Sequence, residues 1–160
     1  MGKNAQGRVA LMSIRPEFSD AILSGEKVVE FRKRPVADDV SHVLIYATMP
    51  VGSLVGWFAV RGQKTMSPKE LWSTFRAVGG ISKCRFFEYY DQREQGTGIL
   101  VDSAARFPRP VPLSELGTSL RPPQSFQYLT AAQSDTFFEM VRTQPSDELE
   151  SELYPLARVG

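Results

Sequence analysis

The most informative segment of this chain is residues 25–32, which read Gly25-Glu26-Lys27-Val28-Val29-Glu30-Phe31-Arg32. A glycine suited to a turn is followed by four ionisable side chains, of which Lys27, Glu30 and Arg32 are interspersed with valine and phenylalanine. Because valine and phenylalanine favour burial, the charged side chains between them are held close to a core. Charged groups held in this way are typical of a binding or catalytic cleft.

The spacing of the charged residues predicts which face of the strand each side chain lies on. Successive side chains of a strand point to opposite faces, so Val28, Glu30 and Arg32 share one face and Val29 and Phe31 share the other. Lys27 follows the turn, and its long side chain can fold back toward Glu30. Such a lysine can clamp a phosphate or polarise a carbonyl, and the carboxylate can act as a general base. The alternative is an exposed Glu30–arginine pair, which contributes only about 0 to 1 kcal/mol.

The residues before this segment predict a strand and then a helix. Residues 9–15 are nearly all apolar, as in a buried strand. Pro16 suits the first turn of a helix, and Gly25 suits the left-handed residue that ends one. We therefore expect a second strand at residues 27–33 that starts where this helix stops.

The rest of the chain predicts an α+β fold. Ser67, Ser82 and Thr130 have the sequence contexts of helix N-caps. We expect strands at 43–48, 53–61 and 99–107, a proline-rich sheet edge at 107–112, a strand-like piece ending near 129, and helices at 68–75, 83–91 and 131–142. Strands outnumber helices and are joined mostly by turns, which favours a curved mixed β-sheet or small β-barrel surrounded by helices. The strand–helix alternation of a doubly wound sheet is missing.

The length of 160 residues, 42% of them hydrophobic, suits one core rather than two. We expect a flexible N-terminus at 1–8, one domain at 9–143 and a C-terminal tail with several acidic residues at 144–160. No apolar run reaches the roughly 18 residues that a membrane span needs, and the first residues lack the apolar core of a signal peptide. We therefore expect a cytoplasmic protein without a membrane partner.

The net charge of +1 provides no overall attraction to nucleic acid. Any such contact needs a local basic patch, for which the sequence offers residues 32–34, Lys83 with Arg85, and the arginines at 106, 109 and 121. Each of these clusters is equally consistent with an ordinary solvated face. No helix-turn-helix signature or basic recognition helix is present, so we expect no sequence-specific binding of duplex DNA.

The chain has one cysteine, Cys84, and one histidine, His42. A single cysteine excludes a multi-cysteine zinc site, and we expect it to pack on a helix rather than act as a nucleophile. His42 precedes an expected strand, so we place it at the surface or at a strand edge. No cluster of histidine, cysteine or carboxylate residues has the spacing of metal ligands, and we expect neither a metal nor a cofactor.

Gly25, Lys27, Glu30 and Arg32 occupy the four fixed positions of the pattern GxKxxExR. This pattern is the signature of the ASCH family, a branch of the PUA-like superfamily, and the chain resembles that family. The surroundings are also similar, with Ser-Ile-Arg-Pro at 13–16 ahead of a helix and Pro-Pro-Gln-Ser-Phe at 122–126. The resemblance covers residues 9 to about 129 and implies a five- or six-stranded barrel-like sheet with helices around it and a cleft near the motif.

Domains that this chain resembles are associated with recognition of RNA or modified nucleobases. We therefore expect Lys27 and Arg32 to contact phosphates or base edges and Glu30 to accept from a donor on a base. We also expect an aromatic ring to stack on the base, and the candidates are Tyr46, Trp57 and Phe126. Four further residues are expected to complete this binding site: Arg15, Arg34, Gln124 and Ser125.

The resemblance also implies an enzymatic alternative, because one ASCH group hydrolyses N4-acetylcytidine and others are described as ribonucleases. The first group uses a lysine, a threonine and a glutamate, but here the threonine position holds Glu30. A metal-independent hydrolase of a modified nucleoside or of RNA would use Lys27 as electrostatic stabiliser and Glu30 as base. A third alternative is a regulatory module that contacts proteins through a helix with Phe137 and Phe138 or through the acidic tail. The oligomeric state is not set by the sequence.

Overall fold

A computed structural model describes residues 7–143, which adopt a mixed α+β fold. Its strands are β1 (Arg8–Ile14), β2 (Val29–Arg32), β3 (Val40–Ala47), β4 (Ser53–Met66), β5 (Gly96–Val111) and β6 (Phe126–Tyr128). Its helices are α1 (Pro16–Ser24), α2 (Pro68–Phe75), α3 (Lys83–Tyr89), α4 (Ala131–Thr143) and a single 3-10 turn at Leu113–Glu115. Most of the expected flexible N-terminus and the whole expected C-terminal tail lie outside the described residues.

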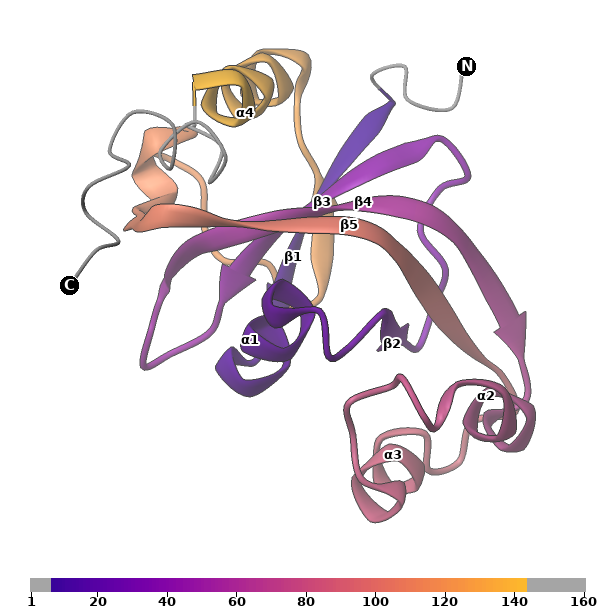
Figure 1. Cartoon of the computed structure of the whole chain (residues 1–160). Helices are drawn as coiled ribbons and strands as arrows, with labels where there is room; N and C mark the ends of the chain where they lie inside the picture. Colours follow the sequence, from indigo (N-terminus) through magenta and orange to yellow (C-terminus); the bar gives the residue numbers. More distant parts are fainter. Residues whose placement is uncertain (1–6, 144–160) are drawn as a thin grey trace, which may run out of the picture.

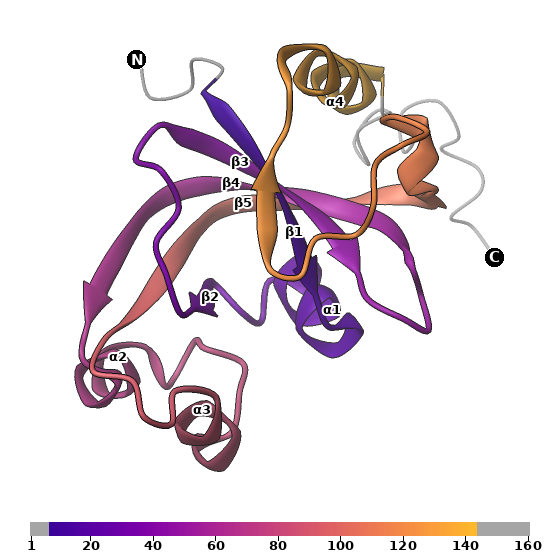
Figure 2. The ribbon, with the colours of Figure 1, turned by 180° about the vertical axis from the view of Figure 1, so that it is seen from behind.

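The six strands form one curved sheet in the order β2-β5-β4-β3-β1-β6 (Figures 1 and 2). Strands β1 and β3 are parallel, and every other neighbouring pair is antiparallel. The strongly bent β4 and β5 form the long middle of the sheet (Figure 1). The predicted curved mixed sheet of an α+β fold is therefore confirmed.

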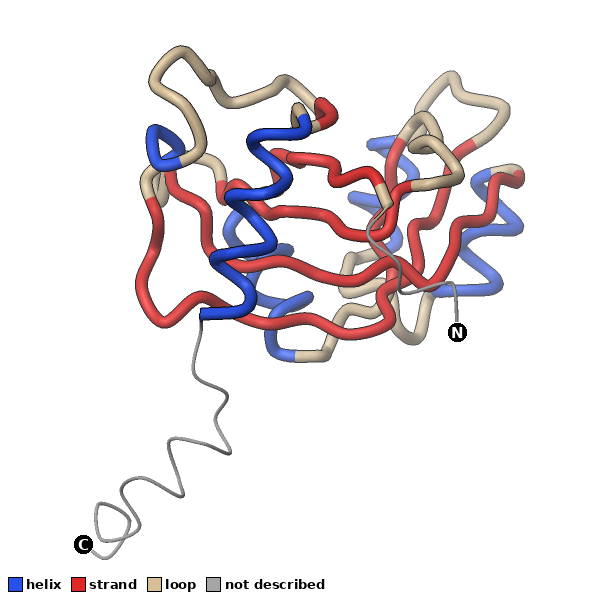
Figure 3. Tube along the Cα trace, turned by 90° about the horizontal axis from the view of Figure 1, so that it is seen from above, coloured by secondary structure: helices blue, strands red, loops and turns tan. Residues whose placement is uncertain are grey.

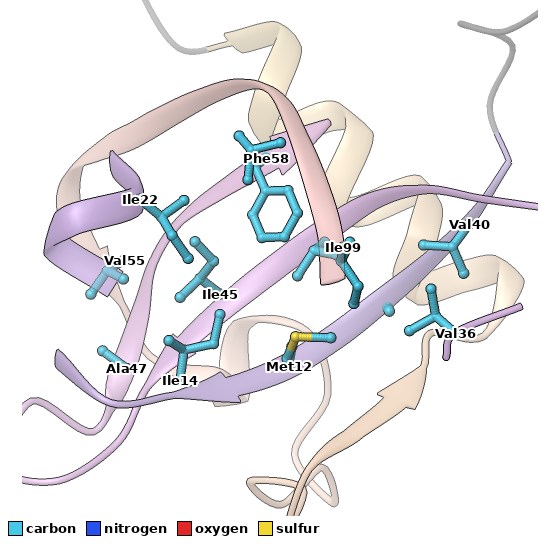
Figure 4. Packing of buried hydrophobic residues seen from close by; sticks show 13 residues of the cluster. Met12, Ile14, Ile22, Val36, Val40, Ile45, Ala47, Val55, Phe58 and Ile99 are labelled. Atoms are coloured by element: carbon cyan, nitrogen blue, oxygen red, sulfur yellow. The ribbon is translucent and has the colours of Figure 1, made fainter. Parts of the chain in front are cut away.

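Strands β1 and β3 are buried on both faces, which explains their nearly continuous apolar sequences. On one face, alternate residues of both strands pack with Ile22 of α1 and with Phe58 and Ile99 of the long strands (Figure 4). On the other face, Leu11 and Leu44 belong to a second cluster beneath α4. Alternation of side chains along each strand places the two sets on opposite faces.

Helix α4 runs across the second face of the sheet (Figure 3). Phe137 is fully buried, and the rings of Phe137 and Phe138 lie 5.9 and 5.1 Å from the ring of His42. His42 therefore does not lie at a strand edge, because β3 is an internal strand and α4 covers the ring. Phe137 likewise packs against the chain's own sheet and offers no surface to a partner protein, whereas Phe138 is only partly buried.

The partial burial of His42 predicts a pH-dependent stability. Desolvation lowers the pKa of the imidazole below its ordinary 6.5. As pH falls through about 6.5, the unfolded chain takes up a proton that the folded ring resists, so the free energy of unfolding decreases. Urea unfolding between about pH 7.5 and 5.5 measures this loss. His42→Phe leaves no histidine in the chain and should flatten the profile, whereas parallel profiles for the two proteins would contradict the prediction.

Helix boundaries agree with the expected caps. Gly25 has φ 88° and its amide donates to the Ile22 carbonyl, which is the expected end of α1. Ser67 forms a capping box with Glu70, and Ser82 accepts from the Arg85 amide. Thr130 and Gln133 exchange the reciprocal hydrogen bonds of a second capping box, at 3.2 and 2.9 Å.

The strands differ in length from their predictions. β2 starts at residue 29 rather than 27, because the Val28 amide donates to the Val78 carbonyl of the loop between α2 and α3. β4 continues to Met66, beyond the predicted end at Arg61, because residues 62–66 remain paired with residues 96–100 of β5. Residues 101–111 of β5 lie beyond its pairing with β2, so the proline-rich segment does form the expected edge.

Candidate functional site

The motif residues Lys27, Glu30 and Arg32 converge in the structure. Lys27 Nζ lies 3.7 Å from Glu30 Oε1, and an Arg32 guanidinium nitrogen lies 3.3 Å from Glu30 Oε2. The side chains of the three residues are 2%, 7% and 11% exposed, in that order. Glu30 therefore holds a cation at each carboxylate oxygen, which excludes the alternative of an exposed surface pair.

Lys27 is directed inward rather than toward solvent. Its ammonium donates to the Gly79 carbonyl and lies 5.2 and 4.9 Å from the ring centroids of Phe18 and Phe31. Burial lowers the pKa of Lys27, and the nearby Glu30 carboxylate partly opposes that shift. Lys27 thus links the motif to the loop after α2.

The loop that covers Lys27 depends on two glycines. Gly80 has φ 61°, a left-handed conformation that favours glycine. A Cβ atom at Gly80 would lie 2.9 Å from Cβ of Lys27, and one at Gly79 would lie 2.8 Å from the Phe31 ring. The glycines allow the loop backbone to approach closely enough for its carbonyl to accept from Lys27.

Arg32 joins the motif to the loop before β6. Its guanidinium donates to the Ser13 carbonyl at 3.3 Å and to the Ser125 hydroxyl. Ser13 reinforces this link, because its hydroxyl donates to the Pro123 carbonyl at 2.6 Å and its amide donates to the Ser125 carbonyl at 3.0 Å. One guanidinium thus connects β2, β1 and the 122–125 loop, with the planar array of donors that lysine lacks.

These elements enclose a cleft of about 1000 Å³, which we call the motif cleft. Its walls come from the end of β1, the start of α1, the motif strand, α3 and the loop before β6. All seven site residues expected from the sequence line it: Arg15, Lys27, Glu30, Arg32, Arg34, Gln124 and Ser125. The fold brings these residues to one place, and their role in binding remains a prediction.

The motif cleft is strongly basic. Seven of its lining residues are lysine or arginine, and only Glu30 and Glu88 are acidic. Lys33, Arg85 and Arg93 join the predicted cations, and of these Arg85 is paired with Glu17 at 2.8 Å. Basic clusters at 32–34 and at Arg85 were visible in the sequence, but only the fold shows that they face each other. The arginines at 106, 109 and 121 do not line this cleft.

Aromatic rings also line the motif cleft. Phe126 does so as expected, whereas Tyr46 and Trp57 pack in the cluster on the opposite face of the sheet. Sequence reasoning missed Tyr89, whose ring lies 4.9 Å below the Lys33 ammonium and whose pKa is raised chiefly by desolvation. The sequence did contain a signal for it, because Tyr89 follows Arg85 by four residues on α3 and this spacing places both side chains on one face of the helix.

No group of three histidine, cysteine or carboxylate residues within residues 7–143 has the arrangement of a metal site. Over the same residues, no helix is long and apolar enough to cross a membrane. The expected packing role of Cys84 is wrong, because its side chain is exposed on α3.

Comparison with known proteins identifies relatives of this domain. The ASCH domain model matches residues 12–103. A protein named ASCH domain-containing ribonuclease from Zymomonas mobilis is 33% identical over 124 residues, which cover 75% of this chain and 83% of that protein. The ribosomal protein uL22 of Ureaplasma parvum is 29% identical over 120 residues, but this chain spans only 38% of its length.

Comparison with solved structures also identifies an ASCH protein as a relative. A crystal structure of an ASCH protein from Zymomonas mobilis, with a serine replaced by alanine, superimposes with a TM-score of 0.76 and 30% identity. The match covers 82% of this chain and 95% of that one. The family model spans more than half of this chain, and the relative of 33% identity is matched over most of its own length. The chain is therefore a member of the ASCH domain family.

Proposed function

We propose that this protein binds single-stranded RNA in the motif cleft. The observation that carries this proposal is the concentration of seven lysine and arginine residues in the cleft of a chain whose net charge is only +1. Cationic grooves attract the phosphate backbone, and aromatic rings beside them stack on unpaired bases. The 33% identical relative named as a ribonuclease supports RNA as the nucleic acid.

Different side chains take different parts in this proposal. Lys33, Arg34 and Arg93 are exposed and have no ion-pair partner among residues 7–143, so they contact phosphates. Phe126 and Tyr89 offer ring surface for stacking. Arg32 contacts a phosphate or a base edge, and Glu30 keeps its guanidinium in place. Lys27, which is almost inaccessible, positions Glu30 rather than touching the RNA.

The test is binding of a labelled single-stranded oligonucleotide by fluorescence anisotropy at two salt concentrations. Lys33→Gln/Arg34→Gln/Arg93→Gln should weaken binding by at least about tenfold and reduce the salt slope of log K by about 2, since each lost single-strand contact contributes about 0.7. The control removes three charges elsewhere, as Lys64→Gln/Arg109→Gln/Arg142→Gln. Equal losses in both triple variants would contradict binding in the cleft.

Cleavage of the bound RNA is a second candidate function, favoured by the ribonuclease name of the same relative. Arginine and lysine side chains in the motif cleft would stabilise the negative charge that grows on the phosphate. Both oxygens of Glu30 face cations, so Glu30 serves to position Arg32 rather than as the free base that sequence reasoning proposed. Incubation with RNA and with its 2′-deoxy analogue tests this, because attack by a 2′-hydroxyl requires RNA. An uncut RNA substrate would leave binding as the function.

A further inference from the structure

A second hollow, of about 670 Å³, lies on the outside of α2 and α3, and we call it the α2–α3 hollow. Its polar lining includes three cations, Lys69, Arg76 and Lys83, and one carboxylate, Glu70. The Glu70 carboxylate accepts from the Ser67 amide in the capping box of α2. The three cations are exposed and have no ion-pair partner among the described residues. The hollow therefore presents uncompensated positive charge.

Two aromatic rings lie among these cations. Trp72 and Phe87 line the α2–α3 hollow and are only half-buried. Their centroids are 6.1 Å apart with the ring planes tilted by 56°, and Trp72 also packs against the buried Phe86 at 5.2 Å. The core thus fixes one side of Trp72 while part of its ring remains available. Cations that surround partly exposed rings match the chemistry of an unpaired nucleotide, which carries a phosphate and a stacking base.

Helix α3 separates the α2–α3 hollow from the motif cleft. Lys83 and Phe87 line the hollow, whereas Arg85, Glu88 and Tyr89 line the cleft. At about 100° per residue, Cys84 falls on the crest between these two faces, which agrees with its exposure. A helix with side chains is about 10 to 12 Å across, and stacked nucleotides rise about 3.4 Å each. Three or so nucleotides therefore suffice to cross α3.

We propose that the α2–α3 hollow is a second binding site for single-stranded RNA, which receives nucleotides of a strand that leaves the motif cleft across α3. Lys69, Arg76 and Lys83 contact its phosphates, and a base stacks on Trp72 and Phe87. The inference rests on the proposed function, because the strand that enters the hollow is the one bound in the cleft. The hollow extends the binding site and makes affinity depend on RNA length.

The first test compares oligonucleotides of about 4 and about 12 nucleotides, within the range of site sizes for single-strand binding. Lys69→Gln/Arg76→Gln/Lys83→Gln changes only exposed side chains. It should weaken binding of the 12-mer about tenfold and lower its salt slope by about 2, while binding of the 4-mer stays unchanged. The control is Lys64→Gln/Arg109→Gln/Arg142→Gln, which removes the same charge from residues that line neither the cleft nor the hollow.

The second test uses Cys84, the only cysteine in the chain, as a native reporter on the crest of α3. The 12-mer should slow its alkylation by iodoacetamide at least severalfold in the natural protein, and the 4-mer should not. The protection by the 12-mer should disappear in the Lys69/Arg76/Lys83 variant. The inference is overturned if the 12-mer binds this variant as tightly as the natural protein, or if Cys84 reacts equally fast with and without it. If neither oligonucleotide binds the natural protein, the proposed function fails and the inference fails with it.

Discussion

Glu30→Ala is expected to lower the free energy of unfolding by about 3 to 5 kcal/mol, because it leaves two buried cations without their shared carboxylate. Lys27 lies 3.7 Å from one oxygen of Glu30 and Arg32 lies 3.3 Å from the other. Urea unfolding at neutral pH measures the loss. The matched control is Asp102→Ala, which breaks an exposed pair with Arg61 at 3.1 Å and should cost only about 0 to 1 kcal/mol.

A second variant tests whether the loss comes from a buried charge without a partner or simply from removal of a charged side chain. Lys27→Met replaces the buried ammonium with an apolar chain of similar length and leaves Glu30 paired with Arg32, so it should cost much less than Glu30→Ala. Lys27→Met should also recover part of the loss when added to Glu30→Ala. The stability deficit of Glu30→Ala should shrink as pH rises toward 10.5, the ordinary pKa of lysine, because Lys27 in the folded protein loses its proton first. A Glu30→Ala loss no larger than that of Asp102→Ala would show that the buried network contributes little.

Phe86→Ala is expected to cost about 3 to 5 kcal/mol, the usual range for truncating a fully buried phenylalanine. Its ring is 0% exposed and lies 4.9 Å from the rings of Phe31 and Tyr90 and 5.2 Å from that of Trp72. Through these contacts Phe86 joins α3 to the motif strand and to α2. Thermal or urea unfolding measures the change in stability.

Phe86→Ala should also weaken RNA binding below its unfolding temperature, because the cavity loosens the wall that carries Arg85 and Tyr89. Phe86→Leu keeps most of the volume and should restore much of both the stability and the affinity. Phe87→Ala is the control for stability, since this neighbour on α3 is only half-buried and should cost less. If Phe86→Ala and Phe87→Ala destabilised the domain equally, the packing assigned to Phe86 would be wrong.

The local features of the fold were predictable because nearby residues determine them. Caps at Gly25, Ser67 and Thr130 satisfy backbone groups within a few residues, and apolar runs mark the central strands β1 and β3. Strand ends were less predictable. β4 continues past Arg61 because pairing with β5 satisfies its backbone, even where its side chains are charged or absent, as at Lys64 and Gly62.

The candidate site was predictable in its members but not in its internal arrangement. The motif pattern and the 122–126 segment identified residues that share one cleft. The inward direction of Lys27 depends on the Gly79 carbonyl, which is 52 residues away in sequence. The choice of Phe126 over Trp57 as a cleft aromatic depends on which face of the sheet each strand presents, and no local pattern sets that choice.

The sequence by itself determined the family, the α+β class, most helix boundaries and the charged residues of GxKxxExR, because these depend on local spacing and burial preference. Only the tertiary structure decided that Glu30 is locked between two cations and that Lys33, Arg85 and Arg93 complete one basic cleft. It also decided that a second basic hollow lies across α3. These features arise from contacts between segments far apart in the chain, whose relative positions are set by the register of the sheet and by the packing of α1, α2 and α3 against it.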